Sequence, residues 1–336
     1  MTVSIGTIQF GYSIGSWNTA FVAYKYKHGW GDDDASNKQA FSQSITTAGS
    51  AVGALFSGPL LGMGRWKCIL LTNIFVIVGA GMTLIDNWSI FLIGRFLYGA
   101  ACGGFSVFCP KYISEVAPIE LKGPAGGLTQ ICITFGIIVP FTIGLFYKPD
   151  DIEGNLDLQN QCIYILFILP ILLGIMQVLL LLTVFNYDTP IMIKQSGEYE
   201  KLKRLMSNIY HPYVVQEKID EIGAANETSL EDNGDVSYGQ ACCNPQYSRA
   251  TFVGCALAIF QQLTGINFIM FYSNTIFASL GGISPVMITF YVGLVNFIAT
   301  FGGLFLLFKA GRRTIMLNMN ALMALILLMV GFCSLK

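Results

Sequence analysis

Long apolar segments alternate with short polar ones along almost the whole chain. Each apolar segment runs for about 20 residues, the length that an α-helix needs to cross the hydrocarbon core of a membrane. The segments are continuously apolar, whereas the strands of a membrane barrel alternate. The pattern therefore predicts an all-α polytopic membrane protein with nine spans, at residues 2–22, 40–61, 68–86, 89–108, 124–146, 162–185, 251–277, 285–308 and 314–334.

A long polar segment interrupts this pattern after the sixth span, from about Asp188 to Tyr247. It contains two stretches that we expect to form short amphipathic helices, Glu198–Met206 and Val214–Ile222. Six spans, a long loop and further spans are typical of transporters built from two helical bundles. We therefore predict three parts, namely an N-terminal six-helix bundle at 1–187, an intracellular loop and helical domain at 188–247, and a partial C-terminal bundle of three helices at 248–336.

The composition fits this class and excludes others. Of the 336 residues, 54% are hydrophobic and only 12% are charged, and the net charge is −1; a soluble domain carries about 25% charged residues. These values argue against a disordered chain, an ordinary soluble enzyme and a protein that binds nucleic acid through basic charge. The sequence has no nucleotide-binding loop, catalytic triad or metal-ligand pattern, so we expect neither enzymatic activity nor a cofactor or metal.

Basic residues in the loops predict the orientation of the chain. One set of alternate loops holds 13 Lys and Arg residues, and the opposite set holds 4. Because loops on the inner side of a membrane are enriched in Lys and Arg, we expect the N-terminus to lie inside.

The seventh predicted span carries an unusual group of polar residues. The run Gln261–Asn267 includes three carboxamides, and Tyr272 and Asn274 follow it. Polar side chains inside a membrane are costly and therefore mark candidate sites. Carboxamides both donate and accept hydrogen bonds, which suits a neutral ligand rich in hydroxyl groups, although they can also join helices to one another. Gln130 in the fifth span and Asn296 in the eighth could complete such a site.

The run Gln261–Asn267 resembles the seventh-helix signature of facilitative hexose transporters and their sugar:proton relatives in the major facilitator superfamily. Further motifs fall in the order found in that family, and together they cover essentially the whole chain. They are Gln9–Tyr12, Gly94–Phe96, Pro110–Pro118, Leu121–Gly123 and Ala310–Arg313.

This resemblance implies a major-facilitator-like fold and a role for particular residues. It implies that a hexose or related polyol binds at Gln130, Gln261, Gln262, Asn267 and Asn296, and that Tyr272 gates the outer side. It further implies a cytoplasmic charge network, formed by Arg65, Glu115, Lys122, Arg312 and Arg313, that stabilises the outward-open state. A simpler interpretation of these five charges is that they only determine topology.

The resemblance also bears on the energy source. Proton-coupled members of the family carry a carboxylate in the first helix that faces the arginine of the fourth, which corresponds to Arg95. Here the matching position is Ser13. Since a serine has no proton to exchange near neutral pH, we expect facilitated diffusion, that is, uniport.

The number of predicted spans departs from the family pattern, which has twelve. We expect a chain truncated after the ninth helix, a partner polypeptide that covers the incomplete C-terminal half, or a transport-inactive subunit of a larger membrane complex derived from a transporter. The resemblance implies the plasma membrane as the default location, and an organelle membrane is the alternative.

Overall fold

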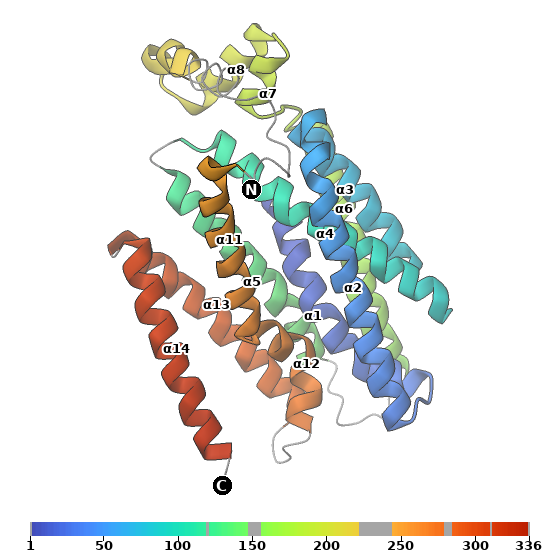
Figure 1. The fold of residues 1–336 in the computed structure, drawn as a ribbon. Helices are drawn as coiled ribbons and strands as arrows, with labels where there is room; N and C mark the ends of the chain where they lie inside the picture. The colour runs from blue at the N-terminus through green and yellow to red at the C-terminus, as the bar shows by residue number, and fades with distance from the viewer. Residues whose placement is uncertain are drawn as a thin grey trace.

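A computed structural model describes residues 2–118, 121–146, 156–221, 244–278, 284–309 and 311–334. The described residues form mainly long helices (Figure 1). The helices are α1 (Ser4–Lys27), α2 (Asp32–Leu60), α3 (Arg65–Met82), α4 (Trp88–Val116), α5 (Lys122–Phe146), α6 (Leu156–Thr183), α7 (Pro190–Gln195), α8 (Tyr199–Ile209), α11 (Pro245–Leu263), α12 (Ile266–Ala278), α13 (Pro285–Lys309) and α14 (Arg312–Ser334), with short 3₁₀ turns at Leu61–Met63 and Pro212–Val214.

These helices confirm the predicted fold class of an all-α polytopic membrane protein and lie close to the predicted spans. Among the described residues, seven helical segments are long and apolar enough to cross a membrane, and α14 contains a shorter apolar stretch, Arg313–Met329. The N-terminus lies near α7 and α8, and the C-terminus lies at the other end of the bundle (Figure 1). We call these the loop end and the opposite end.

The sequence predicts nine apolar spans, and the main difference from the seven found among the described residues is at α1. This helix forms over the predicted segment but is not among the seven apolar ones, because it carries polar residues such as Gln9, Ser13 and Asn18. It packs against α4, α5, α6 and α12, and 16 of its 24 residues are buried. A helix that other helices enclose does not face lipid, so its surface can be polar when its polar groups find partners.

Glycine allows the central helices to approach closely. On α4, a Cβ atom at Gly99 would overlap the carbonyl oxygen of Thr46 on α2, and one at Gly103 would overlap that of Ser50. Gly11 on α1 and Gly136 on α5 likewise allow these two helices to approach closely, because a Cβ atom at either position would overlap a carbonyl oxygen of the other helix. Small residues are how membrane helices pack backbone against backbone, and this packing fixes the positions of α1, α2, α4 and α5 around the centre of the protein.

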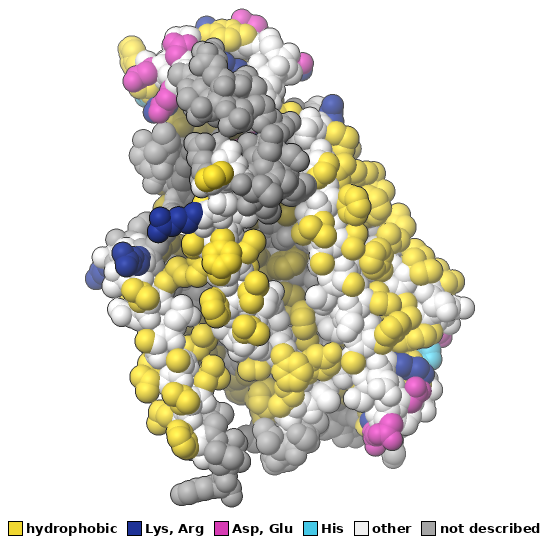
Figure 2. All heavy atoms as spheres, in the orientation of Figure 1, with side chains coloured by type: hydrophobic (Ala, Val, Ile, Leu, Met, Phe, Trp, Pro, Cys, Tyr) yellow, Lys and Arg dark blue, Asp and Glu magenta, His cyan; other side chains and the backbone are white. Residues whose placement is uncertain are grey.

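The segment after α6 forms a small unit with a core of its own. Ile193, Leu202, Met206, Val215 and Ile219 pack together, which confirms the amphipathic character expected around α8 and residues 215–221. Figure 2 shows acidic and basic side chains gathered towards the two ends of the molecule, with hydrophobic side chains covering the helices between them. This distribution is the one that a bilayer requires.

Candidate functional site

The seventh predicted span, 251–277, lies within one apolar segment long enough to cross a membrane, Ser248–Phe277, but the helix is interrupted inside it. Helix α11 ends at Leu263 and α12 begins at Ile266. Between them Gly265 has φ +75°, a left-handed conformation that glycine adopts without steric cost. The hydroxyl of Thr264 donates a hydrogen bond to the Gln261 carbonyl oxygen at 2.7 Å, which satisfies one of the carbonyl groups exposed by the break.

The break brings side chains on its two sides together. The amide nitrogen of Asn267 on α12 donates a hydrogen bond to the amide oxygen of Gln262 on α11, at 2.6 Å. Within the described part of the chain, this pairing leaves the amide nitrogen of Gln262 and the amide oxygen of Asn267 for a ligand. Broken helices with polar groups at the break are how membrane transporters build binding sites near the middle of the bilayer.

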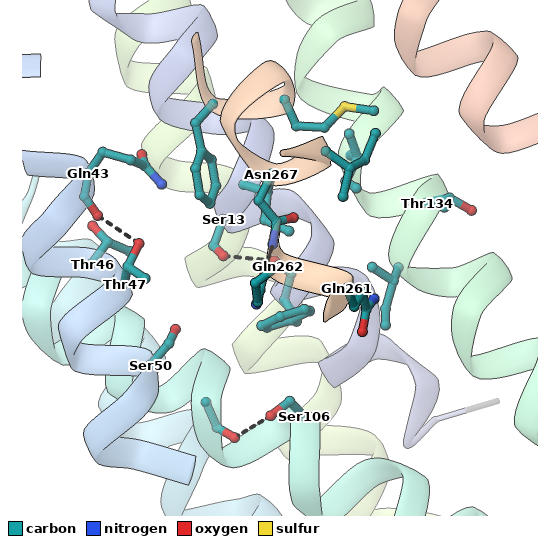
Figure 3. A pocket seen from close by; sticks show the side chains of 18 of the residues that line it. Ser13, Gln43, Thr46, Thr47, Ser50, Ser106, Thr134, Gln261, Gln262 and Asn267 are labelled. Carbon is teal, nitrogen blue, oxygen red and sulfur yellow. Dashed lines mark hydrogen bonds between the residues drawn. The ribbon is translucent and has the colours of Figure 1, made fainter. Parts of the chain in front are cut away.

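All five carboxamides predicted to bind a ligand line one cavity of about 650 Å³. Helices α1, α2, α4, α5, α11, α12 and α13 contribute to its wall, and Figure 3 shows Gln261, Gln262 and Asn267 near the break with residues of α2 across from them. The polar residues of the lining are Ser13, Gln43, Thr46, Thr47, Ser50, Ser106, Gln130, Thr134, Gln261, Gln262, Asn267 and Asn296.

The chemistry of the cavity is uniform. Each polar lining side chain carries a hydroxyl or a carboxamide, and the others are apolar, among them Phe10, Ile14 and Met270. The volume falls in the range of about 300–1,000 Å³ that is usual for small-molecule sites. Such a wall can donate to and accept from a neutral polyhydroxylated ligand but offers no fixed charge to an ionic one.

A network of hydrogen bonds joins α1 to α12 and α13 between this cavity and the opposite end. The amide nitrogen of Asn18 on α1 donates to the Met270 carbonyl oxygen at 3.2 Å and to the Ser273 hydroxyl at 2.6 Å. The amide nitrogen of Asn274 donates to the Asn18 carbonyl oxygen at 3.0 Å, and its amide oxygen accepts a hydrogen bond from the Thr289 hydroxyl on α13 at 2.7 Å. We call Asn18, Ser273, Asn274 and Thr289 the polar seam; all four side chains are buried.

Most of the polar seam could not be predicted from the sequence. Asn274 stands out as a polar residue in an apolar span, but no motif connects it to Asn18, which lies 256 residues away. The available signal was a second amide in the first span. What that amide contacts depends on how α1 docks against α12.

Two of the five charged residues that the resemblance singles out, Arg65 and Glu115, form an ion pair in the structure. Arg65 donates to Glu115 at 2.9 Å, and Lys111 lies 3.6 Å from the same carboxylate. The Arg65 and Glu115 side chains are only 13% and 6% exposed. Arg313 is exposed and forms no ion pair among the described residues. The side chains of the other two predicted members, Lys122 and Arg312, lie outside the described residues.

Asp188 adds a contact that links the start of α3 to the segment after α6. Its carboxylate oxygen Oδ1 accepts hydrogen bonds from the backbone nitrogens of Arg65 at 3.1 Å, Trp66 at 3.3 Å and Thr189 at 2.8 Å. It therefore caps the first turn of α3, where amide groups have no partner within the helix.

Two further predicted positions lie away from the cavity lining. Tyr272 is half-buried on α12, with its ring 5.1 Å from that of Phe268, and the neighbouring Phe271 lines the cavity instead. Arg95 is fully buried on α4, with its guanidinium 5.5 Å from the centre of the Trp17 ring. Its Nε and Nη2 atoms have no hydrogen-bond partner among the described residues, which agrees with the absence of a carboxylate at Ser13.

The family of the chain follows from a comparison with known protein families. A family model described as "Sugar (and other) transporter" matches residues 1–336. The chain belongs to this family. The family consists of membrane transporters rather than enzymes, which agrees with the expectation that the chain has no enzymatic activity.

Individual relatives are consistent with this assignment. The chain is 28% identical over 331 residues to "Hexose transporter 1" of Plasmodium knowlesi, covering 94% of this chain and 66% of that protein. It is 35% identical over 283 residues to the bovine "Solute carrier family 2, facilitated glucose transporter member 2", covering 82% and 54%. The chain thus spans about two thirds, or less, of the length of these curated relatives.

A solved structure shares the fold. The partially occluded inward-open conformation of the xylose transporter XylE from E. coli matches with a TM-score of 0.72 and 19% sequence identity, covering 93% of this chain and 72% of that one. This likeness confirms the major-facilitator-like fold that the sequence motifs implied.

Proposed function

We propose that the chain binds a hexose and carries it across a membrane by facilitated diffusion with alternating access. The observation that supports this most is the convergence of five carboxamides from α5, α11, α12 and α13 on one uncharged cavity, at a break in a membrane helix. The printed names of the curated relatives, a hexose transporter and a facilitated glucose transporter, point to the same class of substrate.

Uniport is supported by the chemistry of the cavity lining. None of the described residues that line the cavity is Asp, Glu or His. At the position where proton-coupled relatives carry a carboxylate, the Ser13 hydroxyl donates to the Phe10 carbonyl oxygen at 2.7 Å. A serine hydroxyl does not exchange a proton with water near neutral pH, so a proton gradient has no carrier at this position.

Alternating access requires contacts that form and break at the two ends of the bundle. The polar seam joins α1 to α12 and α13 between the cavity and the opposite end. The pair Arg65–Glu115 stabilises the arrangement of α3 and α4 towards the loop end. We assign the gate of the opposite end to the polar seam together with Tyr272, and the gate of the loop end to the charge network of Arg65, Glu115, Lys122, Arg312 and Arg313.

The orientation and location form part of this proposal. The loops that carry 13 basic residues include those at the loop end, where the N-terminus also lies. By the excess of Lys and Arg in inner loops, the loop end faces the cytoplasm and the opposite end faces outward, in the plasma membrane.

Equilibrium binding tests the substrate assignment. The purified protein in lipid nanodiscs is titrated with D-glucose and L-glucose, in the wild type and in the Gln262→Ala variant. We expect the wild type to bind D-glucose in preference to L-glucose, and Gln262→Ala to weaken D-glucose binding by about tenfold, the value of one or two hydrogen bonds. A matched control is Gln216→Ala, at an exposed position beyond α8. Equal binding of both enantiomers, or no binding of either, contradicts the proposal.

A second candidate function is a structural subunit that is paired with a partner protein along the C-terminal helices. The observation that favours it is the surface of α14, where Leu317 and Leu328 are 63% and 61% exposed and the amides of Asn318 and Asn320 are exposed as well. Polar groups that face lipid are unfavourable, so a partner would stabilise this helix. Gentle extraction from the native membrane, followed by measurement of mass, distinguishes a large complex from a chain that migrates alone.

A further inference from the structure

The wall of the cavity formed by α2 carries polar groups that no motif in the sequence singled out. Gln43, Thr46, Thr47 and Ser50 are three or four residues apart, so they share one face of the helix. All four line the cavity, and Figure 3 shows them across it from Gln262 and Asn267. A ligand held at the helix break therefore meets a second polar wall on its far side.

The three hydroxyl groups of this wall already donate to backbone carbonyl oxygens. Thr46 donates to Ser42 at 2.9 Å, Thr47 to Gln43 at 3.0 Å, and Ser50 to Gly99 on α4 at 3.0 Å. A hydroxyl has one donor and two acceptor lone pairs. As arranged, these three groups can accept a hydrogen bond from a ligand but have no proton left to offer it.

Gln43 differs from its three neighbours. Its side chain is 5% exposed, and its amide oxygen has no hydrogen-bond partner among the described residues. A buried acceptor without a partner is unfavourable. The terminal torsion of a glutamine is broad, so the carboxamide can turn towards the cavity at low cost. It is then the one group of the α2 wall that can both donate to and accept from a ligand hydroxyl.

We propose that Gln43 contacts the substrate directly and determines specificity for one hydroxyl group of the sugar, on the side that faces away from Gln262 and Asn267. This inference rests on the proposed function, because it takes a hexose as the ligand. The sugar is held between two carboxamide sites, one at the break between α11 and α12 and one on α2. A hexose that lacks the hydroxyl facing α2 loses the second site only.

The test combines one substitution with a series of sugars. Binding of D-glucose and of its monodeoxy analogues, each lacking a different hydroxyl, is measured for the wild type and for Gln43→Leu, with the full chain in nanodiscs. Leucine keeps most of the volume and removes both polar atoms. The matched control is Ser44→Ala on the same helix, at an exposed position that does not line this cavity.

We expect one analogue to bind the wild type about tenfold more weakly than D-glucose does. The same analogue and D-glucose should bind Gln43→Leu with equal affinity. The other analogues should lose affinity for Gln43→Leu by the same factor as D-glucose itself. Such a difference between analogues does not arise from a general loss of folding. If Gln43→Leu weakens the binding of every sugar equally, or changes the binding of none, the role of Gln43 is overturned. The proposed function then still stands, provided that the wild type binds D-glucose. Failure of the wild type to bind any hexose overturns both.

Discussion

The amide nitrogen of Asn18 on α1 lies 2.6 Å from the hydroxyl oxygen of Ser273 on α12, although 255 residues separate them in the chain. This bond joins α1 to the helix that follows the break at Gly265. The same α12 carries Asn267, which lines the cavity at its other end. Closure of the opposite end and the shape of the cavity are thus connected through a single short helix.

Asn18→Ala should weaken this closure. The substitution removes two hydrogen bonds to α12, each contributing about 0.5–1.5 kcal/mol. We expect a cysteine placed at Ile14, on the cavity wall, to react about tenfold faster with a membrane-impermeant maleimide applied from the opposite end. Asn37→Ala, an exposed amide on α2, is the control and should leave the rate unchanged. An unchanged rate in Asn18→Ala would argue against a gating role for the polar seam.

Glu115→Gln should destabilise the protein by about 2 kcal/mol, because it leaves the mostly buried Arg65 guanidinium without its carboxylate. Thermal unfolding in detergent measures the loss. Lys111→Gln is the comparison, since Lys111 lies next to the same carboxylate but its side chain is 50% exposed. That variant should lose less than about 0.5 kcal/mol. Equal losses in the two variants would mean that Arg65 and Glu115 contribute no more than a surface pair.

Asp188→Ala should cost about 1–2 kcal/mol, the usual value of a helix cap, because the first turn of α3 loses the acceptor of two backbone bonds, from Arg65 and Trp66. Glu217→Ala, which removes an exposed carboxylate beyond α8, should cost almost nothing. Thermal unfolding in detergent measures the stability of both variants. A stability of Asp188→Ala equal to that of the wild type would be inconsistent with capping.

Substitutions at two glycines should change stability in opposite directions. In Gly99→Ala the new Cβ overlaps the Thr46 carbonyl oxygen, so α2 and α4 must separate, and we expect a loss of about 1–3 kcal/mol. In Gly81→Ala no atom of the described residues lies within 4 Å of the new Cβ, and the helical position should gain about 0.5–1 kcal/mol. A neutral Gly99→Ala would mean that the helices are less tightly packed than the structure shows.

Much of the fold could be predicted from the sequence because a bilayer imposes a length and a polarity on each span. The helices at 89–108 and 124–146, for example, follow from long and predominantly apolar runs. The same rule made α1 look like the other spans, although it is a polar helix enclosed by its neighbours. Burial inside a bundle depends on tertiary packing, which hydropathy does not record.

The candidate site divides in a similar way. The five carboxamides that line the cavity were predicted, since amides in a membrane span are conspicuous and their motif resembles a known family. The break at Gly265 was missed because a glycine and a threonine within an apolar run are compatible with a continuous helix. The bond from Asn18 to Ser273 and the α2 wall around Gln43 could not be predicted, since each depends on which helices lie side by side.

Transport by the reconstituted protein tests the central proposal most directly. Proteoliposomes containing the full chain are supplied with radiolabelled D-glucose, with L-glucose as the control, both without a proton gradient and with an acidic exterior. We expect D-glucose to enter until its inside and outside concentrations are equal, the proton gradient to leave this end point unchanged, and L-glucose to stay outside. Accumulation of D-glucose above the outside concentration under an acidic exterior, or equal entry of both enantiomers, would overturn facilitated diffusion of a hexose.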